Sequence, residues 1–155
     1  MSVAISCAAE IASPEVYFSP NGGCTAAAVA EIAKAKTAIA FEAYSFTSPE
    51  ILHALRAARS RGVTIRAIYD RSQKNAAKSL ADELGVPAVY GIQKIMHDKV
   101  IVIDAKVVVT GSFNFTVNAE KFNAENMLVL RSPALAKKYL ENFEKMRRGK
   151  LKPET

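Results

Sequence analysis

HDKVIVIDAKVVVTGSFN, at positions 97–114, contains two runs of apolar, mostly β-branched residues separated by a polar Asp-Ala-Lys. Short apolar runs bounded by turn residues are typical of buried strands, and a short polar link between two such runs is typical of a β-hairpin. The pattern therefore predicts strands over residues 99–103 and 106–110, joined by a turn at Asp104-Ala105.

N-terminal to this hairpin, the pattern alternates between strands and helices. Ser48-Pro49 pairs an N-cap with a first-turn proline and begins a helix that Gly62 ends, and Ser132-Pro133 begins the last helix in the same way. The other predicted elements are strands 15–18, 37–44, 63–69, 86–90 and 127–130 and helices 25–36 and 72–85. The whole predicts an α/β protein with a mixed, largely parallel sheet flanked by helices on both faces, in which the antiparallel hairpin carries the functional site.

His97 and Lys99 are two residues apart at the beginning of the hairpin. Side chains at positions i and i+2 of a strand point to one face, so the imidazole and the ammonium are expected side by side. Lys99 can neutralise a phosphate oxygen, and His97 can attack phosphorus or transfer a proton near neutral pH. Ser112 and Asn114 follow the hairpin and offer neutral hydrogen bonds to the same oxygens. These residues predict a phosphate site.

The same stretch matches a longer signature, namely H-x-K, four residues, Asp, six residues, then G-S-x-N. The matching residues are His97, Lys99, Asp104, Gly111, Ser112 and Asn114. With residue frequencies of a few per cent, an accidental match at all six positions is on the order of one in a million. The chain therefore resembles the phospholipase D superfamily, and most closely its small, non-specific bacterial endonucleases. The resemblance implies hydrolysis of a phosphodiester through a covalent phosphohistidine, without a cofactor.

Three carboxylates near the signature have candidate roles. Asp104 has the opposite strand parity to His97, so we expect it to support the site through hydrogen bonds at the turn, or to be a simple turn residue. In the family, an acidic residue downstream of the signature accepts the ring N–H of the histidine and so fixes its tautomer. Glu125 is the residue that fits this role; Glu120 competes with it, and either could be a surface charge.

The chain carries one copy of the signature, whereas each active site of the family combines two. The only other histidine, His53, lies on a predicted helix with no lysine two residues later, and is interpreted as an ordinary, partly exposed histidine. The resemblance thus implies a homodimer that places two copies of His97, Lys99 and Asn114 around one site. One His97 would attack phosphorus while the other protonates the leaving oxygen, so a bell-shaped pH profile is expected.

The net charge of the chain is +6, and half of its residues are hydrophobic. A basic chain favours polyanionic partners, although many basic proteins bind none. We expect nucleic acid as the substrate, DNA with RNA left open. No apolar run is long enough to span a bilayer and no zinc spacing is present, so neither stable membrane association nor a metal is expected. The alternatives are a phospholipase D or phosphatidyl-transfer enzyme, and a non-catalytic nucleic-acid-binding protein of the same fold.

The chain is expected to form a single domain over residues 1–155, of which 1–13 are a flexible remnant of a signal peptide or an ordinary start. The resemblance favours a periplasmic or secreted location. Cys7 and Cys24 are compatible with one disulfide or with two thiols. Gly22-Gly23 predicts a turn, with a phosphate cradle at the next helix as the alternative. The basic residues of the last helix either follow a nucleic-acid backbone or form a solvated face.

Overall fold

The computed structural model describes residues 13–73, 81–87, 89–90 and 95–149. In this part of the chain, seven strands form one sheet in the order β1-β7-β6-β5-β2-β3-β4. The strands are β1 (Glu15–Ser19), β2 (Ala38–Ala43), β3 (Thr64–Tyr69), β4 (Val89–Tyr90), β5 (Lys99–Ile103), β6 (Val107–Gly111) and β7 (Glu125–Arg131).

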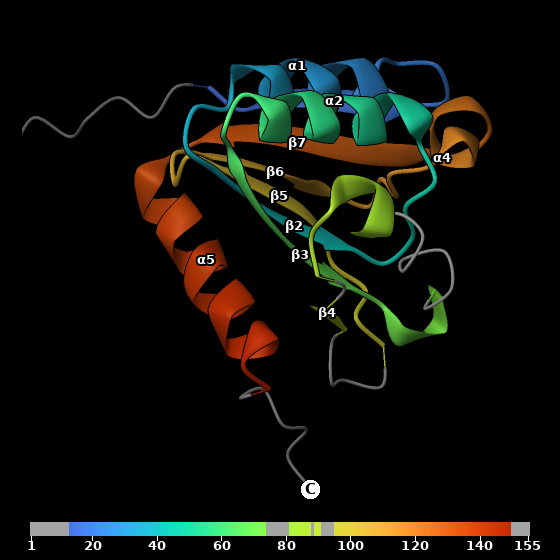
Figure 1. Ribbon diagram of the computed structural model, residues 1–155. Helices are drawn as coiled ribbons and strands as arrows, with labels where there is room; N and C mark the ends of the chain where they lie inside the picture. Colours follow the sequence, from blue (N-terminus) through green and yellow to red (C-terminus); the bar gives the residue numbers. More distant parts are fainter. Residues whose placement is uncertain (1–12, 74–80, 88, 91–94, 150–155) are drawn as a thin grey trace, which may run out of the picture.

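Helices cover both faces of this sheet (Figure 1). The helices α1 (Cys24–Lys34) and α2 (Pro49–Ser60) pack side by side on one face, and α5 (Pro133–Arg147) crosses the other. The two Ser-Pro pairs act as predicted, because the Ser48 and Ser132 hydroxyls accept the backbone N–H groups of Ile51 and Leu135. A short helix that the sequence did not indicate, α4 (Val117–Lys121), follows β6.

The side chains of β5 alternate between two apolar cores. Ile101 and Ile103 face α1 and α2, whereas Val100 and Val102 pack with Phe143 of α5 on the other face. Because both faces of β5 are buried, its sequence is apolar throughout rather than alternating. The hairpin is therefore the centre of the fold, and its first residues are held between two layers of helices.

The α/β class and the mixed sheet are confirmed, but the sheet is not largely parallel. Only β2–β3 and β3–β4 pair in parallel, whereas β1–β7, β7–β6, β6–β5 and β5–β2 are antiparallel. The alternation of strands and helices predicts parallel neighbours only when consecutive strands are adjacent in the sheet. Here the antiparallel β5, β6 and β7 separate β1 from β2, so α1 joins two strands that are not neighbours. Among the described residues, helical connections between parallel neighbours occur only from β2 to β3, through α2, and from β3 to β4, where residues 81–84 are helical.

Several expected elements differ in extent from those observed. Residues 71–73 form a turn of 3₁₀ helix and residues 81–84 are helical, whereas 74–80, in the middle of the helix expected over 72–85, lie outside the described residues. Residues 1–12, which include Cys7, also lie outside them. Cys24 is buried at the beginning of α1 and forms no disulfide with a described residue.

The turn of the hairpin has left-handed backbone at both central residues, with φ of 52° at Asp104 and 53° at Ala105. Two positive φ values define the type I′ turn, whose twist matches that of the strands. The Asp104 carboxylate accepts the backbone N–H groups of Lys36, Thr37 and Ala38 at 2.8, 2.8 and 3.0 Å. The predicted hydrogen bonds at the turn are thus present, and they attach it to the beginning of β2.

Candidate active site at one end of the sheet

Nearly all residues of the signature line one pocket, which we call the signature pocket. Its volume is about 300 Å³, and it lies where β5 begins, β6 ends and β7 begins. These ends meet because the three strands are antiparallel neighbours in the sheet. The lining residues are His97, Lys99, Gly111, Ser112, Asn114 and Glu125. Asp104 lies at the far end of β5 and does not line this pocket.

Lys99 is the most buried charge of the pocket, with 5% of its surface exposed. Its Nζ donates to the backbone oxygen of His97 at 2.6 Å and lies 3.0 Å from Nδ1 of the same residue. Burial lowers the pKa of Lys99, and the negative charges of Asp98 and Glu125 oppose this effect. Few groups solvate this ammonium, so an anionic ligand entering the pocket would be strongly favoured.

The imidazole of His97 is exposed at the pocket, beside the buried lysine. Because a charged Lys99 only donates, Nδ1 of His97 accepts, and a neutral imidazole then carries its proton on Nε2. Nε2 has a free lone pair only in the opposite tautomer of a neutral imidazole, in which Nδ1 carries the proton. The contact with Lys99 thus favours one of the two tautomers of His97.

Glu125 borders the pocket, and its carboxylate accepts the side-chain N–H of Asn123 at 3.1 Å rather than a hydrogen bond from His97. The competing carboxylate, Glu120, is engaged elsewhere. It accepts the backbone N–H groups of Gly23 and Thr25 at 3.0 and 2.7 Å and so caps α1. This structural task leaves Glu125 as the acidic residue of the pocket, and its role toward His97 stays a prediction.

The same cap argues against a phosphate cradle at Gly22-Gly23, which was the alternative to a turn. Gly23 is in left-handed conformation, with φ of 86°, immediately before α1. The backbone N–H groups that a phosphate would need there already donate to the Glu120 carboxylate. The pair is therefore a turn stabilised by a carboxylate from within the chain.

The G-S-x-N half of the signature shapes the pocket through its backbone and side chains. A Cβ atom at Gly111 would lie 2.3 Å from the backbone oxygen of Asn126, so only glycine fits beside β7. The Ser112 hydroxyl accepts the backbone N–H of Asn126 at 3.1 Å, which ties the turn to the same strand. Oδ1 of Asn114 is buried with no hydrogen-bond partner among the described residues, so this side chain has bonding capacity left for a ligand.

Two residues near the pocket were not selected from the sequence. The Tyr44 ring lies 4.4 Å from the His97 ring, measured between centroids, and the Asp70 carboxylate accepts the backbone N–H of Met96 at 2.6 Å. Tyr44 and Asp70 follow β2 and β3, two strands whose neighbours in the sheet could not be deduced from their sequences. The sequence signal that could have found them is the polar or aromatic residue placed directly after each buried strand.

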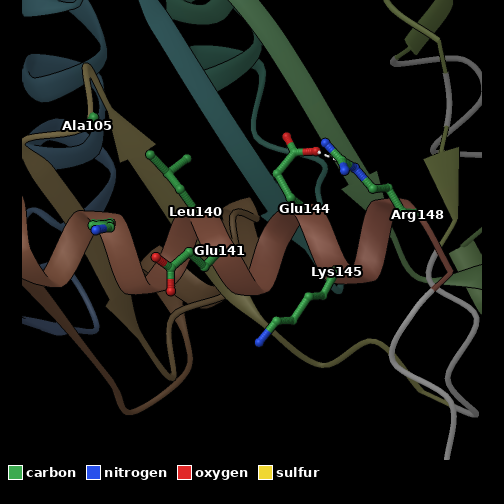
Figure 2. A pocket seen from close by; sticks show the side chains of 7 residues that line it. Ala105, Leu140, Glu141, Glu144, Lys145 and Arg148 are labelled. Atoms are coloured by element: carbon green, nitrogen blue, oxygen red, sulfur yellow. Dashed lines mark ion pairs between the residues drawn. The ribbon is translucent and has the colours of Figure 1, made fainter.

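Other parts of the described chain offer no comparable chemistry. The largest of the described pockets, about 730 Å³, lies along α5, and Figure 2 shows its lining side chains. It holds no histidine, and its lining residues are Ala105, Lys137, Leu140, Glu141, Glu144, Lys145 and Arg148. His53 is exposed on α2. The described residues contain no cluster of three metal-ligating side chains and no helix with the length and apolarity needed to cross a membrane.

Residues 28–147 match the family model of the cardiolipin synthase, PLD-like domain. The chain belongs to the phospholipase D superfamily. Over 133 residues it is 43% identical to a phospholipase D of Rickettsia prowazekii, an alignment that covers 81% of this chain and 63% of that protein. The chain thus spans less than two thirds of the length of this protein and of the similar phospholipases D of Rickettsia typhi and Rickettsia felis.

Solved structures of the phospholipase D superfamily are similar over almost their full length. Nuc from Salmonella typhimurium, a phospholipase D family member, has a TM-score of 0.79 and 39% identity, covering 89% of this chain and 95% of that one. NucT from Helicobacter pylori has a TM-score of 0.77 and 26% identity, covering 86% and 94%. The resemblance inferred from the signature is therefore confirmed, together with the α/β fold and membership of a family of phosphodiesterases.

Proposed function

We propose that this chain is a metal-independent endonuclease that hydrolyses DNA in an active site shared between two copies. The observation that carries the proposal is the signature pocket itself, in which His97, Lys99, Asn114 and Glu125 converge. A net charge of +6 supports a polyanionic substrate. The names of the similar structures Nuc and NucT support nucleic acid in particular.

The proposed chemistry has two steps. A neutral His97 forms a bond to phosphorus while the bond to the leaving oxygen breaks, and a protonated His97 of the second copy gives its proton to that oxygen. Water then attacks phosphorus, the phosphorus–nitrogen bond breaks, and the second histidine takes the proton of the water. Lys99 and Asn114 of both copies hold the non-bridging oxygens, and Glu125 accepts a hydrogen bond from the Nδ1–H group of a histidine that attacks through Nε2.

The need for a second copy follows from the count of histidines. Both histidines of the chain lie in the described residues, and only His97 lines the signature pocket. Two exposed apolar side chains close in sequence to His97 and Glu125 also support a contact with another protein surface. Ile95 and Phe122, 56% and 74% exposed, immediately precede the segments that carry His97 and Glu125. Large exposed apolar side chains beside a site are typical of a protein interface.

Phospholipid hydrolysis is the second candidate. The curated relatives are named phospholipase D, and the family model is named after cardiolipin synthase. Lipid phosphodiesters would use the same histidine, lysine and asparagine, and the exposed Ile95 and Phe122 would suit contact with acyl chains. A non-catalytic nucleic-acid-binding protein is disfavoured because the complete set of His97, Lys99 and Asn114 lines one pocket.

The deciding experiment is nicking of supercoiled plasmid in excess chelator. His97→Ala is compared with wild type and with His53→Ala, a matched control on an exposed helix face. We expect wild type and the control to cut equally and His97→Ala to be at least about 1,000-fold slower. Loss of wild-type cutting in chelator would contradict metal independence. Release of choline from phosphatidylcholine vesicles without plasmid nicking would favour the lipid candidate instead.

A further inference from the structure

Tyr44 joins the end of β2 to the beginning of β5. Ala43 pairs with Lys99 at the last position of the β2–β5 ladder, and the backbone N–H of Tyr44 donates to the oxygen of Asp98 at 3.1 Å. Asp98 is the residue between the histidine and the lysine of the signature. The backbone of Tyr44 is therefore fixed against the catalytic segment, and its half-buried side chain extends from this anchored position.

The ring of Tyr44 contacts both functional side chains of that segment. Its centroid lies 4.4 Å from the centroid of the His97 ring, with the two planes inclined at 53°. Nζ of Lys99 lies 4.8 Å from the same Tyr44 centroid. One aromatic ring thus borders the imidazole and the ammonium, whose nitrogens are themselves 3.0 Å apart.

This arrangement addresses an electrostatic difficulty of the site. In the proposed mechanism, the His97 that acts as the acid is protonated. Its positive imidazolium is then repelled by the positive Lys99 at this distance. The face of an aromatic ring attracts cations through its negative quadrupole. Contact with one ring can therefore offset part of the repulsion and can also restrict rotation of the imidazole.

We propose that Tyr44 is a positioning residue of this active site, whose aromatic ring orients His97 and stabilises the pair of positive charges formed by His97 and Lys99. The proposal rests on the proposed phosphodiesterase function. The ring itself acts, rather than the hydroxyl, because both contacts are made to the ring. Because the ring contacts His97 and Lys99, replacing Tyr44 should slow the chemical step more than it weakens the binding of substrate.

Two variants separate the ring from the rest of the side chain. Tyr44→Phe keeps the ring, and Tyr44→Leu removes it while leaving an apolar side chain. With a small chromogenic phosphodiester as substrate, we expect Tyr44→Phe to keep kcat within about threefold and Tyr44→Leu to lose about 10- to 100-fold in kcat, with KM changed much less. An unchanged kcat in Tyr44→Leu, or an equal loss in Tyr44→Phe, would overturn the proposal.

Nuclear magnetic resonance of the imidazole C–H groups gives a readout that does not depend on turnover. The chain has two histidines, so His53 serves as an internal reference. Wild type and Tyr44→Phe are expected to show His97 signals displaced by the ring current of residue 44, with cross-relaxation between the two rings. In Tyr44→Leu only the His97 signals should move. Undisplaced His97 signals in wild type, or equal movement of His53, would overturn the proposal.

The two readouts distinguish failure of this inference from failure of the proposed function. If wild type cleaves no phosphodiester, the proposed function fails, whereas the imidazole signals of wild type and Tyr44→Phe still test the contact. If wild type is active but its His97 signals show no contact with Tyr44, only the role of Tyr44 is wrong. If Tyr44→Leu does not fold, the His97 signals of the wild-type protein still show whether the Tyr44 ring contacts His97.

Discussion

Nζ of Lys99 lies 3.0 Å from Nδ1 of His97, and Lys99 as a residue is buried whereas His97 is exposed. No carboxylate of the described residues forms an ion pair with Lys99, and a buried ammonium without such a partner is costly to the fold. In the proposed function this cost prepares the site for a phosphate, as in other preorganised active sites. This relationship leads to the first prediction.

Replacing Lys99 by methionine should separate catalysis from stability. The methionine side chain fills a similar volume without a charge, so we expect the free energy of unfolding to be unchanged or higher, while plasmid nicking falls by about 100-fold or more. Nicking rates and urea denaturation measure the two effects. Lys106→Met, at the exposed tip of the hairpin, is the matched control and should change neither. A Lys99→Met protein that nicks normally would refute the role of this charge.

Mixing wild type with His97→Ala tests whether the active site is shared. If each site needs a histidine from both copies, mixed dimers are inactive, and an equal mixture keeps about one quarter of the wild-type activity at the same total concentration, rather than about one half. The chains are exchanged by mild denaturation and refolding before the assay. A linear dependence on the wild-type fraction would show that each copy works alone.

Glu42 should make stability decrease as the pH rises. Glu42 is 2% exposed, and its partners in the β2–β5 and β2–β3 ladders are Val100 and Ile68. Burial, with the nearby charge of Asp98, raises the pKa of Glu42 to about 8. Between its ordinary value of 4.5 and about 8, the folded state holds a proton that the unfolded state has lost, so unfolding becomes easier as pH increases.

Glu42→Gln removes this dependence. We expect the variant and wild type to have similar unfolding free energies near pH 5. Near pH 9 the variant is expected to be more stable, by an amount on the order of a few kcal/mol. Urea denaturation at a series of pH values measures the difference, with the exposed Glu141→Gln as control. Parallel curves for wild type and Glu42→Gln would show that the carboxyl is not held neutral by the fold.

Asp104→Ala should destabilise the hairpin by about 1–3 kcal/mol, because the carboxylate accepts three backbone N–H groups and the Thr37 hydroxyl. Burial opposes ionisation of Asp104, but these hydrogen bonds lower its pKa below the ordinary value. The contribution is therefore complete above about pH 4 and is lost as the pH falls through the lowered pKa.

Urea denaturation at neutral and acidic pH measures this contribution. The difference in unfolding free energy between wild type and Asp104→Ala should shrink in acid, since the wild-type carboxyl is then protonated. The activity of the folded variant should fall much less than that of His97→Ala, because Asp104 lies at the far end of β5. A large activity loss without destabilisation would assign Asp104 a direct role in the chemistry.

The elements that the sequence predicted best are those specified by neighbouring residues. The hairpin, its turn at Asp104-Ala105 and the two helices begun by Ser-Pro pairs depend on local backbone preferences, and all are present. The pairing of β1 with β7 was not predicted, because a strand carries no local signal for a partner about a hundred residues away. The proportion of parallel strands was wrong for the same reason.

By itself, the sequence determined the family, since the signature is a local pattern of residues at fixed spacing, and it predicted a phosphate site from the imidazole, ammonium and amide of that pattern. Only the tertiary structure decided the environment of that site. It buried Lys99, used Glu120 to cap α1, and brought Tyr44 against His97 by pairing β2 with β5. Burial and the contacts between distant strands arise from packing, which depends on the whole chain at once and not on any single stretch of it.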